Sequence, residues 1–236
     1  MSEPIMPESY HAIIRHGAYH QREGAPSARQ PYALTDEGVA QARACGDELA
    51  AMIAEHGLQL APVIHCSHQL RAWQTAAEIA DRLRAHGHEI TEIHETGALA
   101  ERGLGSAANL TVAEIEAVLH DDPRHEAPPA GWKSDSDYCL PLEGAESLMM
   151  AGARVAGHLR ESAGAEAGAG RLTVHVGHGA SFRHAAHHLG LLEKEDLSKL
   201  SMFHARALLL CYRGHDSWSR FAGAWKVRTP KEDPID

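Results

Sequence analysis

The sequence predicts an α/β fold with polar, reactive side chains at the ends of its strands. Short β-rich runs alternate with segments of helical periodicity along 236 residues, a length that suits one large α/β domain. Two of these runs lead directly into Arg15-His16-Gly17 and into His178-Gly179. Ligands of open α/β sheets bind outside the carboxyl ends of the strands. If these strands are parallel, the sequence therefore predicts one site at one edge of the sheet.

The expected strands and helices follow from side-chain type and spacing. Branched apolar residues suit buried strands, and apolar residues recurring every three or four positions indicate helices. Thr35 and Ser67 are candidate N-caps of the first two helices, and Gly57 ends the first. The expected strands cover residues 10–14, 62–66, 89–94, 172–177, 205–212 and 218–225, and the expected helices cover 35–56, 67–85, 109–119, 144–162 and 180–189.

Four segments lack such a pattern. Residues 18–30 are polar and are expected to form a loop over the site, and residues 120–141 are rich in Asp, Pro and Gly, as loops are. Residues 163–170 are small and predict a turn, and residues 228–236 predict a mobile tail. The sequence shows no repeat and no long linker, so we expect one domain over residues 1–236 with its core at about 10–225.

Composition excludes several classes of protein. The net charge is −10 without a basic stripe, which argues against nucleic acid as a partner but not against a local positive pocket for phosphate. No apolar run approaches the ~20 residues that span a bilayer, and the acidic start of the chain is unlike a signal peptide. The four cysteines are scattered, which favours free thiols and a cytoplasmic location.

Four strand ends offer side chains that suit phosphoryl chemistry. Arg15 and His16 follow the first strand, Arg71 lies on the helix after the second, Glu101 follows the third and His178 follows the fourth in chain order. A guanidinium is a planar fork for phosphate, and a neutral imidazole is a nucleophile near pH 7. A carboxyl group can protonate a leaving group. The combination predicts a phosphoryl site.

Four further residues lie beside these motifs. Gly17 and Gly179 are expected next to the phosphate, where the backbone must come close to the ligand. His20 and Arg183 are interpreted either as second contacts of the site or as surface residues.

Two other functional classes compete with an enzyme. His184, His187 and His188 have helical spacing and could bind zinc, but no cysteine or carboxylate joins them at a usual spacing, so surface histidines are preferred. A binding module that had lost catalysis would have no need of the complete set of site residues. His65 and His175 lie inside strands and are interpreted as core histidines with satisfied hydrogen bonds.

The order and spacing of five motifs resemble the histidine phosphatase superfamily, the phosphoglycerate-mutase-like fold. The resemblance covers about residues 10–212. The matching motifs are Arg15-His16-Gly17, Ser67-x3-Arg71-x3-Thr75-Ala76, Leu99-Ala100-Glu101-Arg102, Gly144-Ala145-Glu146-Ser147-Leu148 and His178-Gly179-Ala180-Ser181-Phe182-Arg183.

The resemblance implies a three-layer α/β/α fold with a mostly parallel sheet. It implies that His16 is the nucleophile and forms a phosphohistidine, that Arg15, Arg71 and His178 bind the phosphoryl oxygens, and that Glu101 protonates the leaving group. No metal and no cofactor are implied, because cationic side chains supply the positive charge.

The departures from mutases favour a phosphatase. Leu104 stands where a mutase-like chain has Tyr, Val112 stands where a Lys is expected, and residues 114–122 lack an arginine pair. The sequence thus predicts a phosphomonoesterase for a small phosphorylated metabolite or a phosphoprotein, with mutase-type phosphoryl transfer as the alternative. We expect the loops at 18–33 and 104–141 to set the substrate, and the sequence says nothing of the oligomeric state.

Overall fold

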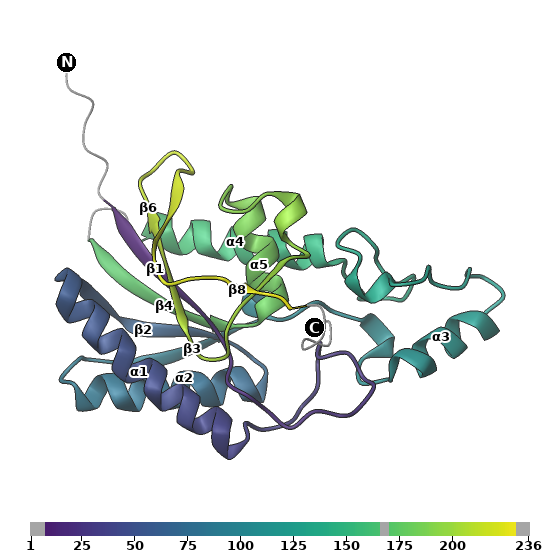
Figure 1. The fold of residues 1–236 in the computed structure, drawn as a ribbon, viewed down its shortest axis with the longest axis horizontal. Coiled ribbons are helices and arrows are strands. Elements are labelled where there is room, and N and C mark those ends of the chain that lie inside the picture. Colours follow the sequence, from purple (N-terminus) through teal and green to yellow (C-terminus); the bar gives the residue numbers. More distant parts are fainter. Residues whose placement is uncertain (1–7, 166–169, 230–236) are drawn as a thin grey trace.

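In the computed structural model, which describes residues 8–165 and 170–229, one six-stranded sheet forms the centre of the molecule (Figure 1). The order across it is β3 (Glu92–Thr96), β2 (Gln59–Ser67), β4 (Arg171–Gly177), β1 (Ser9–Arg15), β6 (Ala207–Tyr212) and β7 (Trp218–Ala222). The first four strands in this order run parallel, whereas β6 and β7 are antiparallel to their neighbours. The predicted α/β fold with a mostly parallel sheet is confirmed.

Helices cover both faces of this sheet. α1 (Asp36–His56) and α2 (Leu70–Ala85) lie on one face, and α4 (Leu148–Ala165) and α5 (Gly179–His188) lie on the other (Figure 1). Adjacent residues of a strand point to opposite faces, so Ile14 packs with the first helix pair and Ile13 with the second. Each face therefore has its own apolar core, and the layers are those that the sequence resemblance implies.

The register of the parallel strands brings their carboxyl ends to one edge. Arg15 lies opposite Gly177 between β1 and β4, and Ser67 lies opposite Thr96 between β2 and β3. The turns that follow these residues start at the same edge. The expected convergence of four strand ends is thus a feature of the fold.

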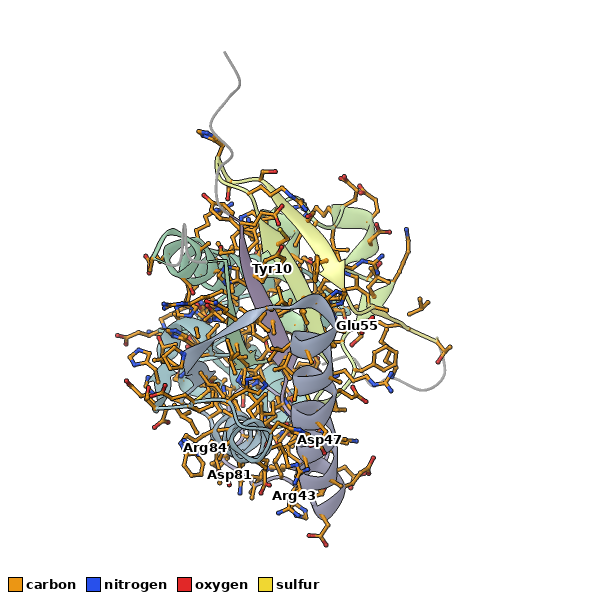
Figure 2. All side chains as sticks on the ribbon, turned by 90° about the vertical axis from the view of Figure 1, so that its left-hand side faces the viewer. Tyr10, Arg43, Asp47, Glu55, Asp81 and Arg84 are labelled. Carbon is orange, nitrogen blue, oxygen red and sulfur yellow. The ribbon has the colours of Figure 1, made fainter. Side chains whose placement is uncertain are left out.

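A glycine allows α1 and α2 to pack closely. A Cβ atom on Gly46 would lie 2.6 Å from the Cβ of Arg82 on α2, a distance that real Cβ contacts essentially never show. At the rim of this contact, Arg82 Nε donates to Asp47 Oδ1 at 2.8 Å. Figure 2 shows Arg43 and Asp47 on α1 beside α2. The outer side of this layer is therefore charged while its inner side is apolar.

Residues 104–142 form a small cap with a core of its own, which projects beyond the sheet with α3 (Val112–Asp121) in Figure 1. Its core includes Leu104, Ile115 and Trp132, together with Ala28 from the loop after β1. The segment 120–141 is thus irregular, as predicted, but it is packed around a buried tryptophan. The short 3-10 turns of the chain are η1 (Gly97–Leu99), η2 (Gly105–Ala107), η3 (Trp132–Ser134) and η4 (Lys194–Asp196).

Several element boundaries differ from the prediction, most clearly at β3 and α4. The strand expected over 89–94 is β3, which starts at Glu92, because its pairing with β2 begins there opposite Val63. The helix expected from residue 144 starts at Leu148, because the Ser147 hydroxyl accepts a hydrogen bond from the backbone N–H of Met150 and caps it. The same helix runs on to Ala165, into the turn expected over 163–170, of which residues 166–169 lie outside the described part.

The last part of the chain contains an unpredicted pair of strands. β5 (Leu200–Ser201) and β8 (Lys226–Val227) form a two-stranded antiparallel sheet. β7 ends at Ala222, not at 225, because Gly223 with a φ of +82° turns the chain. Arg228 is held by its backbone N–H to Lys199 O at 2.9 Å, and residues 230–236 of the expected tail lie outside the described part. Among the described helices, none has the length and apolarity needed to cross a membrane.

Candidate active site

The structure brings His16, Arg71 and His178 into one hydrogen-bonded group. His16 follows β1 directly, Arg71 lies on the first turn of α2, and His178 joins β4 to α5. Arg71 contacts both imidazoles, and the two ring centroids lie 5.2 Å apart. These spacings place both rings within reach of one phosphate-sized anion.

The hydrogen bonds of His16 define which of its nitrogens is a nucleophile. Nδ1 lies 2.8 Å from the backbone carbonyl oxygen of Gly17, which only accepts, so Nδ1 carries the proton. Nε2 lies 3.1 Å from Arg71 Nε, which only donates, so Nε2 holds a lone pair. The backbone thus orients the ring with its nucleophilic nitrogen toward the guanidinium.

His178 is oriented by the same reasoning. Arg71 Nη2 donates to His178 Nδ1 at 3.2 Å, which leaves the proton on Nε2 to be donated to Ser67 Oγ at 3.0 Å. Ser67 was expected to cap α2, but the N-cap is Gln69, and the Ser67 hydroxyl contacts the histidine instead. The last residue of β2 therefore positions a side chain of the neighbouring strand end.

Both imidazoles are neutral in this state. Burial lowers the pKa of His16 well below its usual value, and the positive charges of Arg71 and Arg15 lower it further. The pKa of His178 is lowered in the same way, by burial first and then by Arg71 and Arg15. A neutral His16 has the unprotonated Nε2 that attack on phosphorus requires, and in this state Nε2 accepts a hydrogen bond from Arg71.

Arg71 also holds the loop after β1 over the site. Its guanidinium donates to the carbonyl oxygens of Ser27 at 2.7 Å, Ala28 at 3.0 Å and Gln30 at 2.9 Å, and it lies 4.5 Å from the Tyr19 ring. Arg71 and His178 are 0% exposed and His16 is 1% exposed. The loop after β1 therefore covers the site, as expected of residues 18–30, and an anion must replace these carbonyl groups to reach Arg71.

Glu101 lies at the other wall, against the first turn of α5. Its carboxylate accepts from the backbone N–H groups of Arg102 at 2.9 Å, Ser181 at 3.1 Å and Ala180 at 3.3 Å. The N-terminus of a helix favours negative charge, and the structure shows both oxygens as acceptors. Backbone groups thus hold both carboxylate oxygens of Glu101 beside the helix that follows His178.

Arg15 and the two glycines fit together beside the histidines. Arg15 Nη1 donates to Met202 O at 3.1 Å, and a Cβ on Gly179 would lie 3.0 Å from Arg15 Cδ. A Cβ on Gly17 would lie 2.5 Å from the carbonyl oxygen of Gly38. Both glycines are thus positions where backbone or a functional side chain comes too close for a larger residue.

The two uncertain candidates lie elsewhere. The His20 side chain is exposed, and Arg183 is buried in α5 but lines a different cavity, together with Lys194 and Arg228. Within the described residues no group of three or more potential ligands can hold a metal ion. The histidines at 184, 187 and 188 bind separate backbone or hydroxyl partners. The preference for surface histidines is wrong for His184, which is 1% exposed because α5 packs against the rest of the fold on this side.

Two supporting residues were not predicted from the sequence. His204 Nδ1 lies 2.9 Å from the His16 carbonyl oxygen, and its ring centroid lies 5.6 Å from that of His16. Thr75 accepts from the Gly17 N–H at 3.0 Å and donates to the Arg71 carbonyl at 2.7 Å. Thr75 belongs to a motif that the resemblance had marked, whereas no local signal points to His204.

The sequence is similar to one family of known proteins. The family model described as histidine phosphatase superfamily (branch 1) matches residues 12–221. No curated protein matches the sequence.

Solved structures with this fold include a hydrolase, a phosphatase and a mutase. "Mycobacterial hydrolase 2" is 22% identical with a TM-score of 0.67, covering 96% of this chain and 95% of that chain. A mycobacterial glucosyl-3-phosphoglycerate phosphatase is 22% identical with a TM-score of 0.65, covering 94% and 98%. A phosphoglycerate mutase from Bacillus anthracis is 16% identical with a TM-score of 0.66, covering 95% and 93%. At these identities the likeness establishes the fold.

Proposed function

Because the chain belongs to the histidine phosphatase superfamily, branch 1, we propose that it hydrolyses phosphomonoesters through a phosphohistidine on His16. The observation that carries the proposal is the state of the His16 ring. Its Nδ1 proton is bound to the Gly17 carbonyl, and its Nε2 lone pair faces Arg71 at 3.1 Å. A nucleophile with a fixed lone pair next to a phosphate-binding guanidinium is what in-line attack on phosphorus needs.

The reaction follows from these positions in two steps. The phosphoryl oxygens replace the carbonyl groups of the covering loop on Arg71, and Arg15 and His178 bind the remaining oxygens. The His16 Nε2 lone pair attacks phosphorus, the bond from phosphorus to the ester oxygen breaks, and Glu101 gives that oxygen its proton. Water then attacks phosphorus, the bond to Nε2 breaks, and Glu101 takes the proton of the water.

The low pKa of His178 in the closed state suits this cycle. Burial first, and then the field of Arg71 and Arg15, lowers the pKa of this imidazole, and a phosphate group with a charge of about −1.5 to −2 opposes that field. Arg71 Nη2 then turns from His178 Nδ1 to the phosphate, Nδ1 takes a proton from solvent, and His178 becomes a donor to the phosphoryl oxygens. Positive charge therefore develops where the transition state is most negative.

Two apolar side chains, at positions where mutase-like chains have Tyr and Lys, favour a phosphatase over a mutase. Leu104 is buried in the apolar core of the cap, and Val112 begins the cap helix. Neither side chain can bind a carboxylate or phosphate. We also propose a reducing compartment such as the cytoplasm, because all four cysteines are free thiols.

The test combines turnover with trapping of the intermediate. The purified protein should hydrolyse p-nitrophenyl phosphate, and an alkaline quench should retain label on a histidine, since phosphohistidine survives base. His16→Ala should lose the label and at least ~10⁴-fold in kcat/KM. His120→Ala, which changes an exposed histidine of α3, should behave as the wild type. Full turnover by His16→Ala would remove His16 from the mechanism.

A further inference from the structure

A basic cavity of about 950 Å³ adjoins the closed catalytic pocket. Arg15 and His204, which flank His16 in space, both line it. So does Ser27, whose carbonyl oxygen accepts from Arg71 at 2.7 Å. The cavity is thus separated from the nucleophile by the same loop segment that an entering phosphate must displace.

The charge of this cavity is opposite to that of the whole chain. Its lining includes five basic residues and one acidic residue, Glu23, whereas the chain as a whole has a net charge of −10. A concave site lined by one sign of charge concentrates ligands of the other sign despite an opposite surface. The basic residues are Arg15, Arg22, Lys133, Arg206 and Lys226.

These cations come from distant parts of the chain and are brought together by tertiary contacts. The unpredicted pairing of β5 with β8 places Lys226 opposite Ser201, close to the segment that follows β5. Ala205 has a φ of 41° and donates its N–H to Arg15 O at 2.8 Å, so the next residue, Arg206, turns toward the cavity. Residues other than glycine rarely adopt this left-handed conformation.

The basic residues differ in what they already bind. Arg22 is engaged with both oxygens of Glu114 at 3.1 Å and holds the cap to the loop after β1. The Arg206 guanidinium lies 5.4 Å from the centroid of the Phe203 ring, and within the described residues no carboxylate is paired with it. Arg206 is exposed and is therefore the cation best placed to take a ligand anion.

We propose that this cavity binds a second anionic group of the substrate, a phosphate or a carboxylate. The inference rests on the proposed function, and it narrows the substrate to a small phosphomonoester that carries a further negative charge. The volume is in the range of sites that enclose small molecules. The walls come from the loop after β1, the cap, the segment after β5, and β8.

The first experiment compares substrates that differ in one anionic group. Wild-type kcat/KM should be at least ~10-fold higher for fructose 1,6-bisphosphate than for fructose 6-phosphate, or for 3-phosphoglycerate than for glycerol 3-phosphate, as one charge-assisted contact allows. The advantage should lie in KM and shrink at high salt, because the contact is between charges. The two pairs separate a phosphate from a carboxylate as the second group.

The second experiment removes the cation. Arg206→Gln should lose at least ~5-fold more kcat/KM on the preferred doubly charged substrate than on p-nitrophenyl phosphate, and Arg206→Lys should recover part of the loss. Arg220→Gln, at an exposed arginine of β7 that does not line the cavity, should leave this ratio unchanged. Thermal unfolding of each variant shows that the fold is kept.

The outcomes separate this inference from the proposed function. Hydrolysis of p-nitrophenyl phosphate with no preference for a second charge and no effect of Arg206→Gln would overturn the anion cavity and leave the phosphatase standing. Absence of any turnover would overturn the phosphatase, and calorimetric binding of fructose 1,6-bisphosphate that Arg206→Gln weakens would still support the cavity. Hydrolysis of an acidic phosphopeptide at least ~10-fold better than either small substrate would overturn the assignment to small molecules.

Discussion

Two groups of histidines lie on the same strands and differ in what their nitrogens contact. His16 and His178, which we propose as the catalytic pair, stand just beyond the carboxyl ends of β1 and β4, where all four ring nitrogens have hydrogen-bond partners. A second group lies within the strands and on α4, with neighbouring ring centroids 5.2–5.4 Å apart. We call it the histidine row, and it consists of His11, His65, His158 and His175.

The histidine row is less satisfied than the sequence suggests. His11 Nδ1 and His175 Nε2 share one hydrogen bond of 3.1 Å, but within the described residues His65 Nδ1, His158 Nε2 and His175 Nδ1 have no partner. The interpretation of His65 and His175 as core histidines is right for their place in the strands and wrong for their hydrogen bonds. Buried imidazoles without partners weaken a fold.

Both groups are neutral, for related but different reasons. Burial lowers the pKa of His11 to about 3 and that of His158 to about 4, and the other histidines add to the shift. In the catalytic pair the additional shift comes first from Arg71. Neutrality alone therefore does not make a nucleophile. The catalytic pair differs because its neighbours include Arg71, a guanidinium of the kind that binds phosphate.

Alanine substitution of one histidine from each group should have the largest effects, on activity in the catalytic pair and on stability in the histidine row. His178→Ala should lower kcat/KM for p-nitrophenyl phosphate by ~10²–10³-fold, because it removes one donor to the developing negative charge. His175→Ala, three residues earlier on β4, should lower the free energy of unfolding while the folded enzyme keeps turnover within ~5-fold. Steady-state kinetics and urea unfolding of both variants measure this, and equal activity losses would place the row in the mechanism.

The role proposed for Glu101 should appear as a dependence of the hydrolysis rate on the leaving group. Glu101→Gln should slow the hydrolysis of an alkyl phosphate by ~10²-fold or more, because an alkoxide needs a proton to leave. It should slow p-nitrophenyl phosphate much less, since nitrophenolate leaves unprotonated. Equal losses on both substrates would show that the contacts of Glu101 with the α5 backbone serve binding or folding, and another acid would have to be sought.

The histidine row should make the protein sensitive to acid. The folded-state pKa values of His11 and His158 lie below the ordinary value of ~6.5, so their stability contribution is complete above pH 6.5 and is lost as the pH falls toward 4. For His158 alone the loss is on the order of 2 kcal/mol, allowing for its partial exposure.

Urea unfolding at pH 7.5, 6.5, 5.5 and 4.5 measures this dependence. His158→Gln should flatten the loss of stability between pH 6.5 and 4.5, whereas His120→Gln on the exposed face of α3 should leave it as in the wild type. A pH profile that His158→Gln does not change would show that the row does not control acid stability.

The smallest effect is expected at two buried threonines. Thr75→Val removes hydrogen bonds to the Gly17 N–H and the Arg71 carbonyl, and should cost about 1–2 kcal/mol of stability and ~10-fold in kcat/KM. Thr173→Val is the matched control in β4, because the Thr173 hydroxyl has no partner within the described residues. It should be neutral or stabilising by urea unfolding. A destabilised Thr173→Val would mean that its hydroxyl has a partner after all.

The sequence by itself determined which side chains stand at the strand ends. The branched residues before Arg15-His16-Gly17 and before His178-Gly179 form buried parallel strands, and parallel strands bring their carboxyl ends to one edge. The motif after Ser67 likewise placed Arg71 on the first turn of α2. These features depend on neighbours in the chain, whose side-chain pattern and turn residues are visible without a structure.

The protonated nitrogen, the orientation and the burial of those side chains depend on tertiary contacts. The tautomer of His16 depends on Arg71, the orientation of His178 depends on Ser67, and the closure of the site depends on carbonyl oxygens of the loop after β1. Arg206 follows the left-handed Ala205, and Lys226 lies in β8, which pairs with β5. Hydrogen-bond direction and local charge arise between groups far apart in the chain, so no local pattern in the sequence encodes them.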